Sequence, residues 1–389
     1  MPGAEYDVAF YLPTMGPLID PKVGRAGGAE KQIWLLARGL AKRGYRICVV
    51  VADAPGGLPS TKDGVDVIVR QPGYGGRGVR RWVGEISALW RTLGPLRTAI
   101  VVQRAAGFST GLVGLITKCK RRRFVYSSAN IVDFDYERLA GSRRDLRLFH
   151  LGIRLADQIV VQTTEQASRC KARFGREATV IRSIAEPAGR AVASPDAFLW
   201  VGRLVPFKQP QAFLALAREL PELRFRMVAL GPGNDPVLER EIVREAGSLA
   251  RLELLPTRPR AELLPLYERA VAVVNTSDWE GMPNTLLEGW ACGVPALSLT
   301  HDPDGVIASD GLGAFAGGSH ERLVACAREM WASRHDRAAL ARRCVEYVRR
   351  EHDMEQVTDG WVRALGLSGP SSRGAGAAPT RESLIAKAS

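Results

Sequence analysis

Two glutamates, Glu280 and Glu288, bracket the string EGMPNTLLE, which follows an apolar run at residues 270–275. The run predicts a buried strand. Pro283 suits the first turn of a helix, where the amide hydrogen that proline lacks is not needed. Either glutamate alone could be an ordinary surface charge on such a strand-to-helix turn. The complete string instead indicates a ligand site at the carboxyl end of a sheet.

The predicted helix runs from about residue 284 to residue 292 and closes at Gly293. Its unpaired backbone N–H groups, around Asn284, Thr285 and Leu286, form an anion site that suits a phosphate. A carboxylate beside that site would repel the phosphate. We therefore expect the glutamate on the loop to accept hydrogen bonds from sugar hydroxyls instead.

Two cations stand five positions apart after another apolar run, in FLWVGRLVPFKQP at residues 198–210. The predicted strand ends at Gly202, and Arg203 and Lys208 follow in a short loop. At the carboxyl end of a strand, two such cations can clamp a diphosphate and stabilise it as it leaves. Without the glutamate string, both would be read as surface charges.

Two glycine-rich turns complete the set. LGPGND at residues 230–235 contains Gly231 and follows a predicted strand, and RAGGAE at residues 25–30 contains Gly27 and Gly28 before a predicted helix. Glycine lets the backbone approach a ligand closely, and a helix N-terminus attracts anions. A structural turn without a ligand is the alternative for each.

These residues need a scaffold that brings strand ends together, and the rest of the chain predicts one. Short apolar runs alternate with amphipathic stretches over nearly all of the 389 residues, which favours an α/β architecture with parallel sheets. We expect two doubly wound, Rossmann-like domains that face each other across a cleft, at residues 1–190 and 191–344, because EPAGRAVASP between them is punctuated by Gly and Pro. Residues 367–389, rich in Gly, Ala, Pro and Ser, are expected to form a disordered tail. The predicted strands are YDVAFYLP, YRICVVVA, TAIVVQ, RFVYSS and DQIVVQT in the first domain and AFLWVGRL, RFRMVALG, LELLP, AVAVVNTS and VPALSLT in the second.

Charge is distributed unevenly along the chain. The protein carries a formal net charge of +13, and residues 1–190 alone contain 15 more Lys and Arg than Asp and Glu. This excess indicates an anionic partner. A nucleic acid is disfavoured because the densest block, KCKRRR at residues 118–123, has no aromatic residues among its cations, and the chain has no zinc-finger spacing. An anionic membrane surface fits better, with a solvated connection as the alternative for this block.

The cellular setting is predicted from three absences. The six cysteines contain no C-x-x-C pair, so neither a zinc site nor a disulfide framework is expected. The N-terminus lacks the basic segment of a secretory signal, and the apolar runs are under half of the roughly 18–20 residues that a membrane span needs. We expect a cytoplasmic protein, peripheral on the cytoplasmic face of the membrane.

Taken together, these motifs resemble the retaining nucleotide-sugar glycosyltransferases of family four, which have the GT-B fold. The paired glutamates, the R-x-x-x-x-K of Arg203 and Lys208, the GPGN loop and the N-terminal GGAE match in order and spacing. The resemblance covers about residues 5–366. It implies that the second domain binds the donor, that the first binds the acceptor, and that a terminal helix at residues 345–366 crosses back to the first domain. It also implies that no metal and no other cofactor is needed.

The same resemblance implies roles for individual residues. Arg203 and Lys208 would hold the diphosphate, Glu288 the ribose and Glu280 the transferred sugar, so that Arg203, Lys208 and Glu280 serve catalysis. Neither glutamate suits attack on the anomeric carbon, so catalysis would come from positioning and from stabilising the departing nucleoside diphosphate. The donor-binding set is Gly27, Gly28, Gly202, Gly231, Gly281, Met282, Pro283, Asn284, Thr285, Leu286 and Glu288.

One position departs from the family pattern. Many relatives carry a histidine after a strand of the first domain, where this sequence reads FVYSSANIVDFD at residues 124–135. Either Ser128 or Asn130 replaces the missing group, or the backbone alone contacts the sugar. Asp133 could bind donor or acceptor hydroxyls, and a solvated loop is the equal alternative for it.

The predicted reaction is transfer of a sugar, with its anomeric configuration kept, to a polysaccharide, glycolipid or lipid-linked acceptor. Two other functions stay open. The missing histidine would also suit a non-catalytic sugar-nucleotide-binding protein on a decayed scaffold. A sugar-nucleotide epimerase shares the two-domain architecture but would leave the basic first half unexplained. The expected partners are the nucleotide-sugar, the acceptor and an anionic membrane surface, with no nucleic acid.

Overall fold

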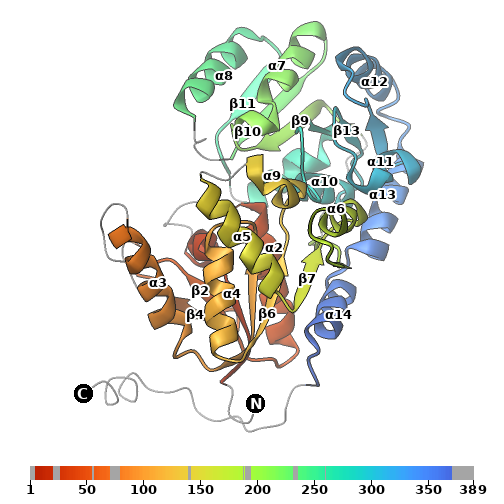
Figure 1. Ribbon diagram of the computed structural model, residues 1–389. Coiled ribbons are helices and arrows are strands. Elements are labelled where there is room, and N and C mark those ends of the chain that lie inside the picture. Colours follow the sequence, from red (N-terminus) through yellow and green to blue (C-terminus); the bar gives the residue numbers. More distant parts are fainter. Residues whose placement is uncertain are drawn as a thin grey trace.

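The computed structural model describes residues 5–20, 27–54, 57–70, 79–138, 142–186, 188, 194–230, 235–258 and 260–369. Gly231 and residues 370–389 of the expected tail lie outside these ranges. The described chain forms two α/β domains, drawn one above the other in Figure 1.

The first domain is built on an eight-stranded sheet in the order β3-β4-β2-β1-β5-β6-β7-β8. All neighbouring strands pair in parallel except β3 and β4, which are antiparallel. The strands are β1 (Tyr6–Tyr11), β2 (Ile47–Val51), β3 (Thr61–Lys62), β4 (Val65–Val69), β5 (Thr98–Arg104), β6 (Arg123–Ser127), β7 (Gln158–Val161) and β8 (Thr179–Val180). The helices are η1 (Pro13–Met15), α1 (Gly16–Ile19), α2 (Gly28–Lys42), α3 (Val79–Leu93), α4 (Ser109–Cys119), η3 (Ile131–Arg138), α5 (Arg143–Leu155) and α6 (Thr164–Phe174).

The second domain is built on a six-stranded, wholly parallel sheet in the order β11-β10-β9-β12-β13-β14. The strands are β9 (Ala197–Gly202), β10 (Phe225–Ala229), β11 (Leu252–Leu255), β12 (Ala270–Asn275), β13 (Ala296–Ser298) and β14 (Gly313–Phe315). The helices are η4 (Pro206–Lys208), α7 (Pro210–Glu219), α8 (Pro236–Ser248), α9 (Arg260–Glu268), α10 (Asn284–Ala291), η5 (Pro303–Gly305), α11 (Val306–Ser309), α12 (His320–Ala332), α13 (Ala338–Glu351) and α14 (Met354–Leu365).

The strands are apolar because both faces of each sheet are buried. Every residue of β2, β9 and β12 is buried, as expected for parallel strands covered by helices on both sides. The strand order reverses between β1 and β5 in the first sheet and between β9 and β12 in the second. Doubly wound sheets bind ligands outside the carboxyl ends of the strands at such a reversal. The predicted pair of doubly wound domains is confirmed.

Four short strands were not predicted from the sequence: β3, β4, β8 and β14. The last of them begins at Gly313, a residue that usually weakens a strand. Glycine fits here because its φ is +151° and a Cβ would lie 2.0 Å from the carbonyl oxygen of Ala296 on β13. Close approach of the two backbones therefore requires the glycine.

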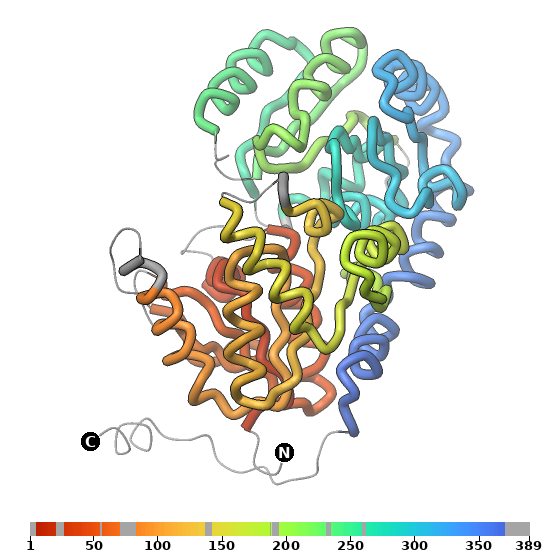
Figure 2. Tube along the Cα trace, in the orientation of Figure 1, coloured from red at the N-terminus to blue at the C-terminus, as the bar shows by residue number. Residues whose placement is uncertain are grey.

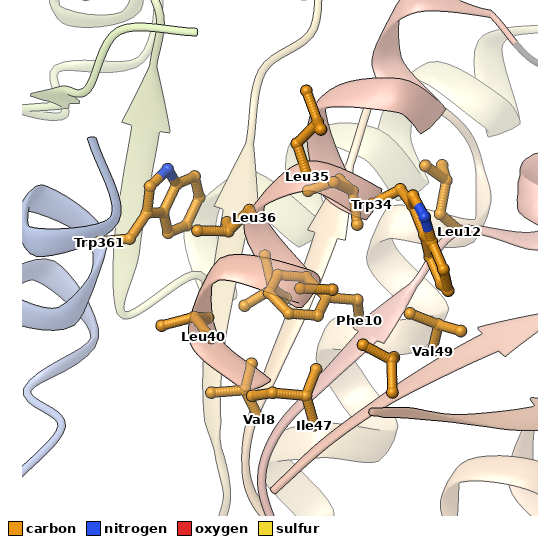
Figure 3. Packing of buried hydrophobic residues seen from close by; sticks show 14 of the residues in the cluster. Val8, Phe10, Leu12, Trp34, Leu35, Leu36, Leu40, Ile47, Val49 and Trp361 are labelled. Atoms are coloured by element: carbon orange, nitrogen blue, oxygen red, sulfur yellow. The ribbon is translucent and has the colours of Figure 1, made fainter. Parts of the chain in front are cut away.

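The described chain crosses back to the first domain through two helices, α13 and α14, whereas a single helix at residues 345–366 was expected. The break follows α13, where the Asp353 side chain accepts hydrogen bonds from the N–H groups of Glu355 and Gln356 and so caps α14. Figure 2 shows these helices, in blue, running from the second domain down along the first. Trp361 of α14 packs in the first-domain core near Leu36 of α2 (Figure 3).

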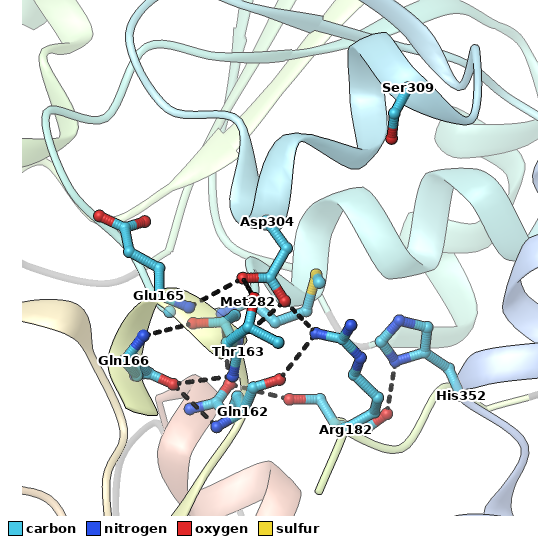
Figure 4. Close-up of polar contacts among 12 residues, drawn as sticks. Gln162, Thr163, Glu165, Gln166, Arg182, Met282, Asp304, Ser309 and His352 are labelled. Carbon is cyan, nitrogen blue, oxygen red and sulfur yellow. Dashed lines mark hydrogen bonds and ion pairs between the residues drawn. The ribbon is translucent and has the colours of Figure 1, made fainter. Parts of the chain in front are cut away.

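A cluster of buried and partly exposed polar side chains joins the two domains (Figure 4). Asp304 of η5 accepts hydrogen bonds from the Thr164 N–H at 3.0 Å and its hydroxyl at 2.8 Å, and it pairs with Arg182. Burial raises the pKa of Asp304, but these hydrogen bonds outweigh burial and hold the pKa below its usual value. The carboxylate therefore stays charged and fastens η5 to the start of α6.

Two further observations concern the described chain as a whole. All six cysteines are present as free thiols. Within the ranges given above, no helix has both the length and the apolar character needed to cross a membrane.

Candidate active site

The candidate site lies at the strand reversal of the second sheet, where β9 ends at Gly202 and β12 ends at Asn275. Each strand is followed by one of the loops that the sequence singles out. The first domain contributes the N-terminus of α2 from the opposite side.

The loop after β9 is fastened to the loop after β12. The Thr276 hydroxyl donates to the carbonyl oxygen of Lys208 at 2.7 Å, and the Asp278 N–H donates to the carbonyl oxygen of Phe207 at 2.9 Å. The rings of Phe207 and Trp279 stack with centroids 5.8 Å apart. These contacts fix Lys208 beside the second loop, although the two loops are about 70 residues apart in the chain.

Lys208 and Glu280 form an ion pair through Glu280 Oε1, which also accepts a hydrogen bond from the Ser277 hydroxyl at 2.8 Å. Glu280 is only 9% exposed. Arg203 is different: it is exposed, and its side chain makes no hydrogen bond or ion pair with any residue that the structure describes. Of the two predicted cations, Lys208 is therefore held in an ion pair, whereas Arg203 is available to a ligand.

Helix α10 begins as predicted, but with a different first turn. Pro283 is the N-cap residue, with φ −64° and ψ 120°, and no side chain caps the helix. The N–H groups of Leu286 and Leu287 both donate to the Pro283 carbonyl oxygen at 3.2 Å. The sequence predicts a free N–H at Leu286, and this prediction is wrong, because that N–H is already bonded. The N–H groups of Asn284 and Thr285 have no partner among the described residues.

Glu288 lies one turn into α10 and is held from two sides. Its Oε2 accepts a hydrogen bond from the Tyr267 hydroxyl at 2.7 Å, and its Oε1 pairs with Lys31 of α2. The same lysine lies 3.2 Å from a carboxylate oxygen of Glu186. Lys31 thereby links the first domain to the glutamate that the resemblance implies for ribose binding.

The N-termini of α2 and α10 come together across the domain interface. Gln32 donates to the side-chain oxygen of Asn284 at 2.8 Å, and a Cβ on Gly28 would lie 2.4 Å from the side-chain nitrogen of Asn284, Nδ2. Each helix N-terminus carries a partial positive charge. Two partly positive helix ends therefore lie close together, and Gly28 allows this close approach.

The other predicted glycines also lie at close approaches. A Cβ on Gly281 would lie 2.9 Å from the carbonyl oxygen of Ala129 in the first domain, and one on Gly202 would lie 2.8 Å from the Trp200 ring. Gly27 is the N-cap of α2. Met282 is buried, and its N–H donates to the side-chain oxygen of Gln162 at 3.3 Å. Of the donor set, Gly231 alone falls outside the described residues.

The first-domain loop that lacks the family histidine is organised by Asp133. Its Oδ2 accepts hydrogen bonds from the Tyr126 hydroxyl at 3.1 Å, the Ser128 hydroxyl at 3.0 Å and the Ala129 N–H at 2.7 Å. Burial raises the pKa of Asp133, and these hydrogen bonds oppose that rise. Ser128 and Asp133 are both buried, so they hold the loop in shape, and Asn130 is the partly exposed member of the predicted trio.

Sequence reasoning missed four residues that hold the site together. Lys31, Ser277 and Tyr267 bind the two glutamates, and His301 lies with its Nε2 3.1 Å from the carbonyl oxygen of Gly281. His301 could have been found, because it closely follows a buried strand at the same sheet edge. The pairing of Lys31 with Glu288 spans 257 positions and leaves no local signal.

A search of the described side chains finds no group of three or more His, Cys, Asp or Glu residues that could hold a metal ion. The charged groups described above for this edge are the exposed Arg203, the ion pair of Lys208 with Glu280 and the ion pair of Lys31 with Glu288.

Comparison with known proteins places the chain in a family. One family model, described as "Glycosyl transferase 4-like domain", matches residues 27–185, and another, "Glycosyl transferases group 1", matches residues 195–333. The D-inositol 3-phosphate glycosyltransferase of Mycobacteroides abscessus is 24% identical over 322 residues, which are 72% of this chain and 71% of the relative. The protein of that name from Mycolicibacterium gilvum is 28% identical over 189 residues, 46% of this chain and 41% of the relative. The chain thus matches less than half the length of the latter relative.

Solved structures share the fold at low identity. The sucrose-phosphate synthase of Thermosynechococcus elongatus superposes with a TM-score of 0.75 at 16% identity, covering 92% of this chain and 98% of that one. Anabaena HepE, solved in complex with UDP and glucose, gives 0.72 at 16% identity, covering 94% of this chain and 100% of that one. The two domain models, the relatives and the fold agree with the motif resemblance. The chain belongs to the family-four glycosyltransferases, with the GT-B fold.

Proposed function

We propose that the protein is a retaining glycosyltransferase that moves a sugar from a nucleoside-diphosphate donor to a polysaccharide, glycolipid or lipid-linked acceptor, without a metal. One observation carries the proposal. Two helix N-termini meet at the edge of the second sheet where Arg203 and Lys208 follow β9 and where Glu280 and Glu288 follow β12. Positive helix ends and cations suit a diphosphate, and carboxylates suit sugar hydroxyls.

In this arrangement the N–H groups of Asn284 and Thr285 and the side chains of Arg203 and Lys208 bind the diphosphate. Glu288 accepts hydrogen bonds from the ribose after Lys31 has moved aside. Since the cations and helix ends already offset the diphosphate charge, we propose that a divalent ion is not required.

The proposed reaction follows from the contacts that the Glu280 carboxylate makes. The bond between the anomeric carbon and the diphosphate oxygen breaks, the acceptor oxygen bonds to that carbon, and the acceptor proton passes to the departing phosphate. Glu280 Oε1 is occupied by Lys208 and Ser277, which suits orienting a sugar better than attacking one. We therefore propose no glycosyl-enzyme intermediate, with catalysis by positioning and by stabilising the leaving group.

The acceptor is assigned to the first domain, with Asn130 as a candidate contact near the transferred sugar. The names of the relatives and neighbours suggest where to begin a screen: UDP-sugars as donors, and inositol phosphates among the acceptors.

The test is a release assay with UDP-, GDP- and ADP-sugars, with and without candidate acceptors and with EDTA. We expect one donor to yield free nucleoside diphosphate, EDTA to have no effect, and proton NMR of the first product to show the donor's anomeric configuration. An inverted product would overturn the mechanism. Failure of every donor to react or bind would favour the decayed-scaffold alternative.

A further inference from the structure

Exposed apolar side chains gather on one part of the first domain. Val83, Ile86 and Trp90 of α3 are 59%, 44% and 45% exposed, and Leu115 of α4 is 39% exposed. The α3 residues are spaced three and four apart, so they lie on one face of the helix. Helices α3 and α4 are packed side by side at the edge of the domain (Figure 1). We call Val83, Ile86 and Trp90 the apolar face; Leu115 lies on the neighbouring helix.

Cations border the apolar face at the carboxyl ends of both helices. The Lys120 ammonium lies 5.0 Å from the centroid of the Trp90 ring. Lys120 also lines an open groove with Trp90, Arg91, Gly94 and Pro95. Arg121 follows in the left-handed conformation, with φ +54°, and is exposed.

Two acidic groups on or next to these helices are already paired. Glu85, the one acidic residue of α3, pairs with Arg70, and Asp157 pairs with Lys118. Neither carboxylate therefore neutralises Lys120 or Arg121, which are exposed beside the apolar face.

The basic block at residues 118–123 is only partly available to a partner. Arg122 donates to the carbonyl oxygens of Leu93 and Gly94, and Arg123 donates to that of Leu365 at 2.7 Å. These two arginines stabilise helix ends, where carbonyl groups lack partners. Lys120 and Arg121 remain as its exposed cations beside the apolar face.

We propose that the apolar face and its border of Lys120 and Arg121 dock the protein onto an anionic lipid bilayer. An amphipathic helix with tryptophan and aliphatic residues on one side, bordered by basic side chains, lies in the headgroup region with its apolar face down. Charge complementarity favours this occupant, because the first half of the chain carries 15 excess positive charges. The inference does not depend on the proposed donor chemistry.

The test is flotation of the full chain with vesicles of phosphatidylcholine alone or mixed with phosphatidylglycerol. The variants are Ile86→Ser with Trp90→Ser, Lys120→Gln with Arg121→Gln, and a control, Val237→Ser with Val243→Ser. The control replaces two apolar residues of α8 in the second domain, which are 54% and 51% exposed and so at least as exposed as Ile86 and Trp90. Circular dichroism and thermal unfolding establish that each variant folds.

We expect the wild type and the control to float with anionic vesicles only, and salt to weaken binding. Each first-domain variant should bind roughly tenfold more weakly or worse. Equal binding to neutral vesicles, no binding at all, or unchanged binding of both first-domain variants would overturn the proposal. So would a dimer in light scattering that Ile86→Ser with Trp90→Ser abolishes, since the apolar face would then bind a second copy.

Discussion

The two sheets reverse their strand order in the same way, yet the polar side chains near the two reversals do different work. In the first domain, Asp133 and Ser128 are buried and bind one another and the loop backbone. Near them, Arg104 donates to the Ser127 hydroxyl at 2.9 Å, and burial lowers its pKa to about 10. In the second domain, Arg203 is exposed and the helix N–H groups are uncapped.

The strand order alone therefore predicts a ligand site at the edge of each sheet. The two edges differ in whether their polar side chains are buried or exposed. A buried network whose members satisfy one another stabilises the fold. Unused donors and exposed cations are available to a ligand. Substitutions at the first edge should then change stability, and substitutions at the second should change rate and affinity.

The largest expected effect is at the second edge. Replacing Arg203 or Lys208 by alanine should lower kcat by about 10²–10³, because each cation would stabilise the departing diphosphate. Steady-state kinetics with the donor found by the release assay measure this. Arg244→Ala on α8 is the matched control, an exposed arginine that should leave kcat unchanged. Equal kinetics in all three variants would remove these cations from the mechanism.

The next effect is at the first edge. Asp133→Ala should lower the free energy of unfolding by about 3 kcal/mol, because it leaves buried donors and Arg104 without the carboxylate. Urea unfolding measures the loss. Asp135→Ala in the same loop removes a partly exposed carboxylate, 2.8 Å from Arg169, and should cost under about 1 kcal/mol. Wild-type stability with lost donor binding in Asp133→Ala would make Asp133 a ligand contact.

A pH effect arises where α13 ends. His352 is fully buried, its Nδ1–H donates to the Ser183 carbonyl oxygen at 2.7 Å, and burial lowers its pKa from 6.5 to about 4. The unfolded chain binds this proton more readily than the folded one, so stability is complete above pH 6.5 and falls toward pH 4. Between pH 7 and pH 5 the loss should be about 2 kcal/mol. Urea unfolding at both pH values should show a smaller loss for His352→Gln than for the exposed control His335→Gln; equal losses would contradict this account.

The smallest effect tests the contact between the two regions. Lys31→Met releases Glu288 for the ribose and should tighten nucleoside diphosphate binding by up to about fivefold, because a partly exposed ion pair contributes about 0–1 kcal/mol. Lys42→Met, exposed on the same helix, is the control. Weaker binding in Lys31→Met would show that Lys31 binds the ligand itself.

The sequence predicted the strands that are buried on both faces, because an unbroken apolar run is a local signal. It missed β3, a polar pair of residues, and β14, which begins at glycine. It merged α13 and α14, although Asp353 before Met354 is a readable cap. It also predicted the two glutamates and the two cations from their local spacing; the structure places them after β9 and β12 at one sheet edge, and their roles stay a prediction.

Two features of the fold were beyond the reach of sequence reasoning. Lys31 meets Glu288 only because the domains pack together, and the burial of Asp133 depends on how its loop folds under α6. Both depend on tertiary packing, which one sequence does not display.

The most direct measurement is calorimetric titration of UDP, GDP and ADP into the wild type, Gly28→Ala and Gly247→Ala. A Cβ at Gly28 would press on Asn284 where the two helix ends meet, whereas one at Gly247 of α8 would meet nothing within 4 Å. We predict that one diphosphate binds the wild type and Gly247→Ala equally, and binds Gly28→Ala roughly tenfold more weakly or worse. Equal binding to all three proteins, or binding of no diphosphate, would contradict a diphosphate site between the helix ends.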